Sequence, residues 1–246
     1  MGRGLPHGRV EAAGAQEGQE MSAAPGRLDP QRRASAEAFI VANTRQLAPP
    51  LVPEIKLYLA EESLPIWQKT EEELGELNVA PPYWAFAWAG GQALARYILD
   101  NPALLQGKRV LDLGAGSGLT AIAAMKAGAE SVLASDLDHI ALAAVHLNAS
   151  LNGVEVQTTA DNLLGKQPGA FGVVLVGDLF YERALADLVS RFIDEAAAAG
   201  ALVLIGDPQR NYFPKGRFCA AAEYRVPVTR ELEDAEIKRT SVWRLG

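Results

Sequence analysis

The chain has 246 residues, more than the ~150 of a typical domain, so we expect one large domain or one domain with an extension. Hydrophobic residues make up 49% and charged residues 22% of the chain, and these proportions exclude wholesale disorder. With 30 acidic residues against 23 Lys and Arg, the net charge of -7 argues against a general nucleic-acid-binding protein. No apolar run approaches the ~18 residues of a membrane span, so we expect no membrane association.

Cys219 is the single cysteine, and one thiol cannot form an internal disulfide or a multi-thiolate zinc site. This composition fits a reducing compartment, so we expect a cytoplasmic protein in which Cys219 is a buried small hydrophobic residue. His139 and His146 lie seven residues apart in a predicted helix with no third ligand nearby in the sequence. We therefore expect no metal site.

The N-terminal stretch differs from the rest of the chain. Residues 1–26 are rich in Gly, Ala, Glu and Gln without apolar periodicity, which predicts a disordered segment. The stretch lacks the apolar region of a secretory signal, and Met21 is an alternative translation start. Residues 27–80 are predicted to form a small extension, and residues 81–246 the main domain.

Local signals predict the elements of the extension. Asp29 as N-cap and Pro30 at the first helical position predict a helix that runs until just before Asn43. Alternating apolar residues predict a short strand over 55–59. The segment 54–76 holds seven acids and two bases, which give it a net charge of -5. It is either a solvated surface or an acidic rim that steers a basic, lysine-bearing protein.

The main domain alternates predicted strands with predicted helices, as a parallel α/β sheet does. Five β-α units followed by an antiparallel pair indicate an α/β fold with a doubly wound sheet and a terminal hairpin. The predicted strands cover residues 109–113, 131–135, 154–158, 171–177, 201–205, 224–229 and 240–245, and the predicted helices cover 92–99, 119–127, 139–151 and 183–199.

A glycine-rich loop follows the first strand of this sheet. Residues 112–118 read DLGAGSG, and glycine there lets the backbone approach a ligand and leaves N–H groups free at a helix N-terminus. Leu119 stands where a dinucleotide fingerprint needs glycine. The pattern D-x-G-x-G-x-G indicates S-adenosylmethionine as the cofactor. Its backbone contacts would come from Gly114, Ala115 and Gly116, whereas a loop without further signals could be only a tight strand–helix turn.

Acidic and amide side chains near this loop complete the predicted cofactor site. Asp112 is placed to meet the cationic amine of the cofactor. Asp136, at the end of the second strand, is placed to hold both ribose hydroxyls. Asp138 competes for that role, but Asp136 directly follows the apolar run of the strand. Asp161 and Asn162 follow the third strand, where they either meet the adenine edge or cap the loop.

The predicted reacting end lies at the tip of the fourth strand, where residues 178–181 read DLFY. Ligands of open α/β sheets bind beyond the carboxyl ends of the strands, so these side chains should face the methyl donor. The carboxylate of Asp178 can hold an incoming amine, and the aromatic groups can wall a slot for its aliphatic stem. The alternative role for Asp178 is to cap the following helix. A Pro-Pro-Tyr-Trp segment at 81–84 is similar to that of DNA and RNA amino-methyltransferases, but Ala80 replaces its acid or amide.

Several segments together resemble the electron transfer flavoprotein β-subunit lysine methyltransferases, a family of seven-β-strand enzymes with a D-x-x-Y motif. The resemblance runs from about Val52 to the C-terminus. The Pro-Pro-Tyr-Trp and Asp-Leu-Phe-Tyr segments are far more restrictive than the glycine loop. The matching segments are 81–92 (PPYWAFAWAGGQ), 112–118 (DLGAGSG), 178–181 (DLFY), 205–208 (IGDP) and 240–243 (TSVW).

The resemblance implies a Rossmann-like seven-stranded sheet and a protein-lysine N-methyltransferase that uses S-adenosylmethionine. It implies that Trp88 contacts the cofactor, with a core aromatic as the alternative, and that Asp178 and Tyr181 border the target lysine. Asp178 would orient the ammonium, and Tyr181 would either bind the amine or wall the slot. The expected partner is the electron transfer flavoprotein β-subunit. A ribosomal protein, a small amine, or a non-catalytic binding role for the fold are the alternatives.

Overall fold

The computed structural model describes residues 1, 28–61, 63–74, 81–228, 233 and 235–245. The segment predicted to be disordered lies, apart from residue 1, outside this described part. Within the described part, no helix is both long and apolar enough to span a membrane.

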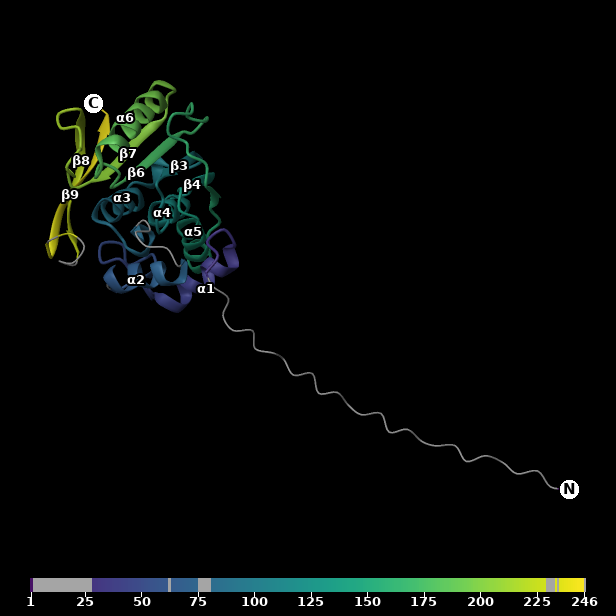
Figure 1. Cartoon of the computed structure of the whole chain (residues 1–246). Coiled ribbons are helices and arrows are strands. Elements are labelled where there is room, and N and C mark those ends of the chain that lie inside the picture. The colour runs from purple at the N-terminus through teal and green to yellow at the C-terminus, as the bar shows by residue number, and fades with distance from the viewer. Residues whose placement is uncertain (2–27, 62, 75–80, 229–232, 234, 246) are drawn as a thin grey trace.

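Seven strands of the described residues form one mixed sheet in the order β5-β4-β3-β6-β7-β9-β8 (Figure 1). From β5 to β7 the neighbouring strands pair in parallel, and β9 and β8 add an antiparallel pair at one edge. The predicted doubly wound sheet with its terminal hairpin is confirmed. The strands are β3 (Arg109–Leu113), β4 (Ser131–Ser135), β5 (Gln157–Thr159), β6 (Val173–Gly177), β7 (Leu202–Asp207), β8 (Phe218–Pro227) and β9 (Ile237–Leu245).

Alternation within each central strand separates two layers of helices. In β6, Val173 and Leu175 pack in the core beneath α3 and α4, whereas Val174 and Val176 pack against α6. Strands that are covered on both faces have continuous runs of apolar residues, and such runs can be recognised in the sequence. Figure 1 shows α6 on one side of the sheet and α3, α4 and α5 on the other. The helices are α3 (Ala89–Asp100), α4 (Leu119–Lys126), α5 (His139–Leu151) and α6 (Arg183–Ala198).

The N-terminal extension packs on α5. Helix α1 (Arg33–Asn43) buries Phe39 and Ile40 in a cluster with the apolar face of α5. Two short strands follow, and the main-chain N–H of Tyr58 in the second donates to Asn148 Oδ1 of α5 at 2.7 Å. The extension thus covers the helix layer beside the cavity described below. Its further elements are β1 (Arg45–Leu47), β2 (Leu57–Leu59) and α2 (Ser63–Leu74). In the main domain, two 3₁₀ turns lie before and after α3, η1 (Tyr83–Ala85) and η2 (Pro102–Leu104).

Two sequence predictions of local structure are wrong. Helix α1 begins at Arg33 after Arg32, and the side chain of Asp29 instead accepts a hydrogen bond from the N–H of Gln31 in a preceding turn. Cys219 is exposed, because it lies on β8 at the edge of the sheet, where few side chains are covered. The hairpin is longer than predicted, since β8 pairs with β9 from Phe218 onward.

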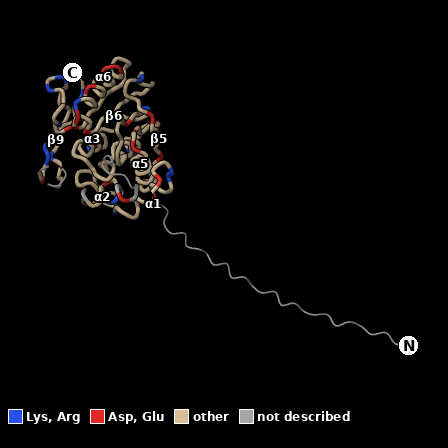
Figure 2. The backbone as a smooth tube through the Cα atoms, in the orientation of Figure 1, with Lys and Arg blue, Asp and Glu red and all other residues tan. Residues whose placement is uncertain are grey.

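Three acids of the segment 54–76 contact bases. Glu54 contacts Arg96 at 2.7 Å, Glu61 contacts Arg45 at 3.3 Å, and Glu72 contacts Lys69 at 3.5 Å. Figure 2 shows acidic and basic residues distributed over several elements around the molecule. These pairs agree with a solvated surface, and the acidic rim stays a prediction.

Candidate active site

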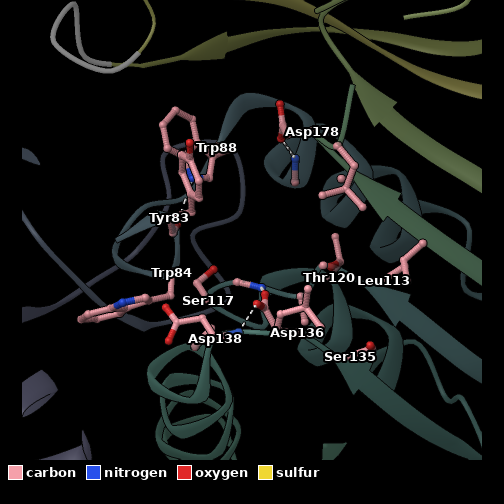
Figure 3. Close-up of a pocket in the computed structure, with 18 of the residues that line it drawn as sticks. Tyr83, Trp84, Trp88, Leu113, Ser117, Thr120, Ser135, Asp136, Asp138 and Asp178 are labelled. Atoms are coloured by element: carbon pink, nitrogen blue, oxygen red, sulfur yellow. Dashed lines mark hydrogen bonds between the residues drawn. The ribbon is translucent and has the colours of Figure 1, made fainter. Parts of the chain in front are cut away.

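A cavity of about 730 Å³ lies at the carboxyl ends of β3, β4 and β6 (Figure 3). Parallel strands end together at this edge, so loops that are distant in the sequence meet here. The lining combines the segment before α3, the glycine loop, the turns after β4, β5 and β6, and one residue after β7. Its polar and aromatic members include Tyr83, Trp84, Trp88, Ser117, Thr120, Asp136, Asp138, Asp161, Asn162, Asp178, Tyr181 and Arg210.

The glycine loop has the backbone that its sequence predicts. Gly114, Gly116 and Gly118 have φ angles of 68°, 49° and 78°, in the left-handed region that favours glycine. A Cβ on Gly114 would lie 2.7 Å from Leu179 Cδ2, so a side chain there would collide with the β6 loop. Ala115, between them, also lines the cavity. The loop therefore presents bare backbone to a ligand.

Asp136 and Asp138 both line the cavity but have different hydrogen bonds. Asp136 accepts from the N–H of Gly116 at 2.9 Å and from the N–H of Asp138 at 3.0 Å, which fixes its carboxylate against the glycine loop. Asp138 caps α5 and accepts from the N–H of Ile140 at 2.8 Å. Burial raises the pKa of the Asp136 carboxyl, and its main-chain donors oppose this rise. Asp136 remains the candidate for the ribose hydroxyls, since Asp138 already serves the helix.

Asp112 does not reach the cavity. Its side chain is 1% exposed and accepts a hydrogen bond from Thr120 Oγ1 at 2.6 Å. Burial raises the pKa of its carboxyl to about 6. Asp112 was expected to meet the cationic amine of the cofactor, but it is not among the residues that line the cavity. Its hydrogen bond to Thr120 instead connects β3 with the first turn of α4.

The turn after β5 contributes Asp161 and Asn162, and both side chains are exposed at the cavity. Asn162 Oδ1 accepts from the N–H of Leu164 at 3.0 Å, which is the loop-capping role. Asp161 contacts Lys166 at 3.5 Å. The adenine contact of Asn162 stays a prediction.

Aromatic side chains form one wall of the cavity. Trp88 precedes α3, is only partly buried, and donates its indole N–H to the Tyr83 carbonyl at 2.9 Å. The ring of Tyr83 lies 5.9 Å from that of Trp88 and 5.5 Å from that of Tyr181. Tyr83 and Tyr181 are each 41% exposed. Trp88 is thus part of the wall rather than a core residue, whereas Trp84 is buried against Phe39.

Asp178 lies at the end of β6 in a left-handed conformation, with φ of 59°. Its Oδ2 accepts from the N–H of Gly91 at 2.8 Å, the contact drawn in Figure 3. Its Oδ1 accepts from Nε and Nη2 of Arg210 at 2.9 and 2.6 Å. Burial raises the pKa of the Asp178 carboxyl, and the Arg210 charge opposes this rise. Helix α6 begins at Arg183 after Glu182, so Asp178 is not its cap.

Sequence reasoning missed Arg210 and Glu233. Arg210 Nη2 contacts Glu233 Oε1 at 2.8 Å, and the Glu233 side chain is 2% exposed. Arg210 follows β7 by three residues, at the same edge of the sheet as Asp178. This position could have indicated from the sequence that Arg210 lies near the site. Glu233 follows β8 and gives no comparable signal. Asp207 ends β7, and its Oδ1 accepts from the N–H of Arg210 at 2.7 Å.

Within the described part of the chain, no three His, Cys, Asp or Glu side chains form a metal-binding group. His146 instead lies 3.0 Å from Thr158 Oγ1, which places it beside β5.

Comparison with known proteins gives consistent matches. The family model described as ribosomal protein L11 methyltransferase (PrmA) matches residues 92–206. The electron transfer flavoprotein beta subunit lysine methyltransferase of Xenopus laevis is 37% identical over 224 residues, which cover 88% of this chain and 90% of that protein. The protein of the same name from Mus musculus is 39% identical over 223 residues, which cover 88% and 85%. A solved ribosomal protein L11 methylase from Lactobacillus delbrueckii subsp. bulgaricus is 25% identical, with a TM-score of 0.46 over 62% of this chain and 77% of that chain.

The matches to the frog and mouse proteins and the geometry of the cavity define the class of the protein: it is an S-adenosylmethionine-dependent methyltransferase of protein lysine. The identity to the frog and mouse proteins extends over most of both sequences. The chain belongs to the electron transfer flavoprotein β-subunit lysine methyltransferase family.

The cavity fits S-adenosylmethionine in volume and in chemistry. Its ~730 Å³ lies within the range of small-molecule sites. The glycine loop would hold the cofactor by its backbone, Asp136 would bind the ribose, and Trp88 would cover it. When bound, the cofactor supplies an electrophilic methyl group. Asp178 and Tyr181 line the same cavity.

Proposed function

We propose that the substrate of this enzyme is the electron transfer flavoprotein β-subunit and that Asp178 and Tyr181 receive its target lysine. The names of the frog and mouse relatives support this substrate. The observation that carries the proposal is that Asp178 and the Tyr83–Tyr181 aromatic pair share one cavity with the glycine loop. A carboxylate orients an amine, and two aromatic rings wall the aliphatic stem of a lysine.

The chemistry requires a neutral amine. A free lysine has a pKa of ~10.4, so its neutral form costs roughly 4.6 kcal/mol at pH 7. Asp178 would orient the lysine nitrogen with its lone pair toward the methyl group that bound S-adenosylmethionine would supply. S-adenosylhomocysteine would be the leaving group, and water would take the proton of the methylated nitrogen. Positioning is the main contribution of the protein to such a displacement.

Mass spectrometry tests the proposed substrate. Purified β-subunit is incubated with the enzyme and S-adenosylmethionine, and its lysine peptides are compared with those of a reaction that contains Asp178→Asn enzyme. We expect methyl increments on lysine with the wild-type enzyme and none with the variant. An unmodified β-subunit in the wild-type reaction contradicts the proposed substrate.

A second substrate class has one specific observation in its favour. The match of residues 92–206 to the ribosomal protein L11 methyltransferase model points to a ribosomal protein. The same assay with purified ribosomal protein L11 in place of the β-subunit separates the two. Methylation of the ribosomal protein alone would select this second class.

A further inference from the structure

The guanidinium of Arg210 contacts two carboxylates at one end of the cavity. Its Nε and Nη2 donate to Asp178 Oδ1 at 2.9 and 2.6 Å, and its Nη2 also donates to Glu233 Oε1 at 2.8 Å. Its guanidinium carbon lies 5.5 Å from the centre of the Trp88 ring. The Arg210 side chain is 17% exposed and lines the cavity. One cation is therefore held beside the carboxylate that is proposed to receive the target lysine.

The charged groups around Arg210 alternate in sign. Asp178 contacts Arg210, Arg210 contacts Glu233, and Glu233 Oε2 lies 3.5 Å from Lys238 Nζ. These two acids and two bases sum to zero charge. Asp207 accepts from the N–H of Arg210, and burial followed by the Asp178 charge raises the pKa of its carboxyl to about 7.

Burial raises the pKa of the Tyr181 phenol at this end of the cavity, and the charge of the neighbouring Glu182 adds to the rise. Asp136 lies at the glycine loop, on the other side of the site (Figure 3). Below about pH 7, where Asp207 is largely protonated, the network beside Asp178 has no negative charge in excess.

This balance decides which form of lysine binds. A carboxylate without a counter-ion favours the charged ammonium, which has no lone pair to attack the methyl group. A carboxylate already paired with Arg210 still accepts a hydrogen bond, but it offers an ammonium little net attraction. The nearby guanidinium also repels a second cation.

We propose that Arg210 is a positioning residue that compensates the charge of Asp178, so that the target lysine binds as the neutral amine with its lone pair free. This rests on the proposed function, because it needs a lysine at Asp178. Glu233 holds Arg210 in place from the other side, so Arg210 stays when the lysine enters. The lysine releases its proton to water as it binds.

Proton release on binding tests the proposal directly. Calorimetry of the β-subunit binding to the enzyme loaded with S-adenosylhomocysteine, repeated at pH 6 in buffers of different ionisation enthalpy, counts the protons released. We expect the wild-type enzyme to release a proton, Arg210→Gln to release clearly less, and Arg210→Lys to recover the wild-type value. Arg217→Gln is the matched control, since Arg217 pairs with Asp194 away from the cavity.

The pH profile of kcat supplies a second readout. Arg210→Gln should raise the pH of half-maximal kcat by about 1 unit, because a nearby like charge shifts a pKa by this order. KM for the β-subunit should stay the same or fall. Glu233→Gln should move the midpoint in the opposite direction, since it leaves the network with an excess positive charge. Loss of packing alone would not produce shifts of opposite sign.

The outcomes separate this inference from the proposed function. If the wild-type enzyme methylates the β-subunit, and Arg210→Gln leaves both proton release and the kcat midpoint unchanged, the role of Arg210 is overturned. Loss of S-adenosylhomocysteine binding in both Arg210 variants would also overturn it, because Arg210 would then maintain the cofactor site. If the wild-type enzyme does not methylate the β-subunit, it is the proposed substrate that fails.

Discussion

Gly90 and Gly206 approach so closely that a Cβ added to either would lie 2.1 Å from the carbonyl oxygen of the other. Gly90 belongs to the first turn of α3 and Gly206 to β7, so this contact lets the helix lie directly on the sheet. The same turn presents the N–H of Gly91 to Asp178, and a Cβ on Gly90 would lie 2.6 Å from Asp178 Oδ2. The placement of the carboxylate therefore depends on two residues without side chains.

Replacement of Gly90 by alanine should destabilise the protein. The added methyl group meets the backbone of β7, and overpacking of this kind costs about 1–3 kcal/mol. Urea denaturation measures the change. Gly91→Ala is the matched control, because nothing lies within 4 Å of its Cβ, and alanine is favoured over glycine in helices by about 0.5–1 kcal/mol. Equal stability of the two variants would refute this account of the contact.

Asp178→Asn should abolish methylation and leave cofactor affinity within a few-fold. Asparagine tolerates the left-handed backbone of this position, so the loop geometry is kept while the charge is lost. Methyl transfer is measured by mass spectrometry and S-adenosylhomocysteine affinity by calorimetry. A large loss of affinity would instead assign Asp178 to the cofactor site.

Asp136→Ala should weaken S-adenosylhomocysteine binding by roughly 10- to 100-fold. The change removes the expected acceptor of the ribose hydroxyls and the acceptor of the Gly116 N–H, and bonds to charged groups are worth about 1.5–3 kcal/mol. Asp138→Asn serves as the comparison, since asparagine also caps helices, and it should bind normally. If Asp138→Asn weakened S-adenosylhomocysteine binding more than Asp136→Ala, Asp138 would be the residue that binds the ribose.

The raised pKa of Asp207 predicts a pH-dependent stability. Burial and the Asp178 charge raise the pKa of this carboxyl from 3.8 to about 7, so the folded protein binds the proton more tightly than the unfolded chain. This contribution to stability is complete below pH 3.8 and is lost as the pH rises to about 7, with a slope of at most ~1.4 kcal/mol per pH unit.

Asp207→Asn should therefore gain stability relative to wild type as the pH rises from 5 to 8, because an amide has no proton to lose. Urea denaturation of both proteins at several pH values gives the difference in unfolding free energy. A difference that does not change with pH would show that Asp207 does not titrate in this range.

The central strands could be predicted because both of their faces are buried. The predicted bounds of β3 and β4 agree with the structure, since each is a short apolar run that ends at a polar or glycine-rich turn. Strand β5 was placed too early, at 154–158 rather than Gln157–Thr159, because its three residues are polar or half-exposed. Strand β8 was begun too late for a related reason: it lies at the sheet edge and alternation along it is weak.

The site could be predicted only where one local segment defines it. The glycine loop and the tip of β6 are contiguous motifs, and the structure brings both to one cavity. Arg210 contacts Asp178 from 32 positions further along the chain, and Glu233 contacts Arg210 from another 23 positions on, so no local segment contains the three residues. Asp112 belongs to the loop motif, but the direction of its side chain depends on Thr120 in the following helix, which the spacing alone does not give.

Cys219 is the single cysteine of the chain and is exposed, so it is a unique site for thiol labelling. Cys219 lies on β8, is the strand-register partner of Arg244 across the hairpin, and is not among the residues that line the cavity. A maleimide dye or spin label can therefore be attached at one defined place without mutagenesis. A change in the signal of such a label would report the docking of a partner protein near the edge of the sheet.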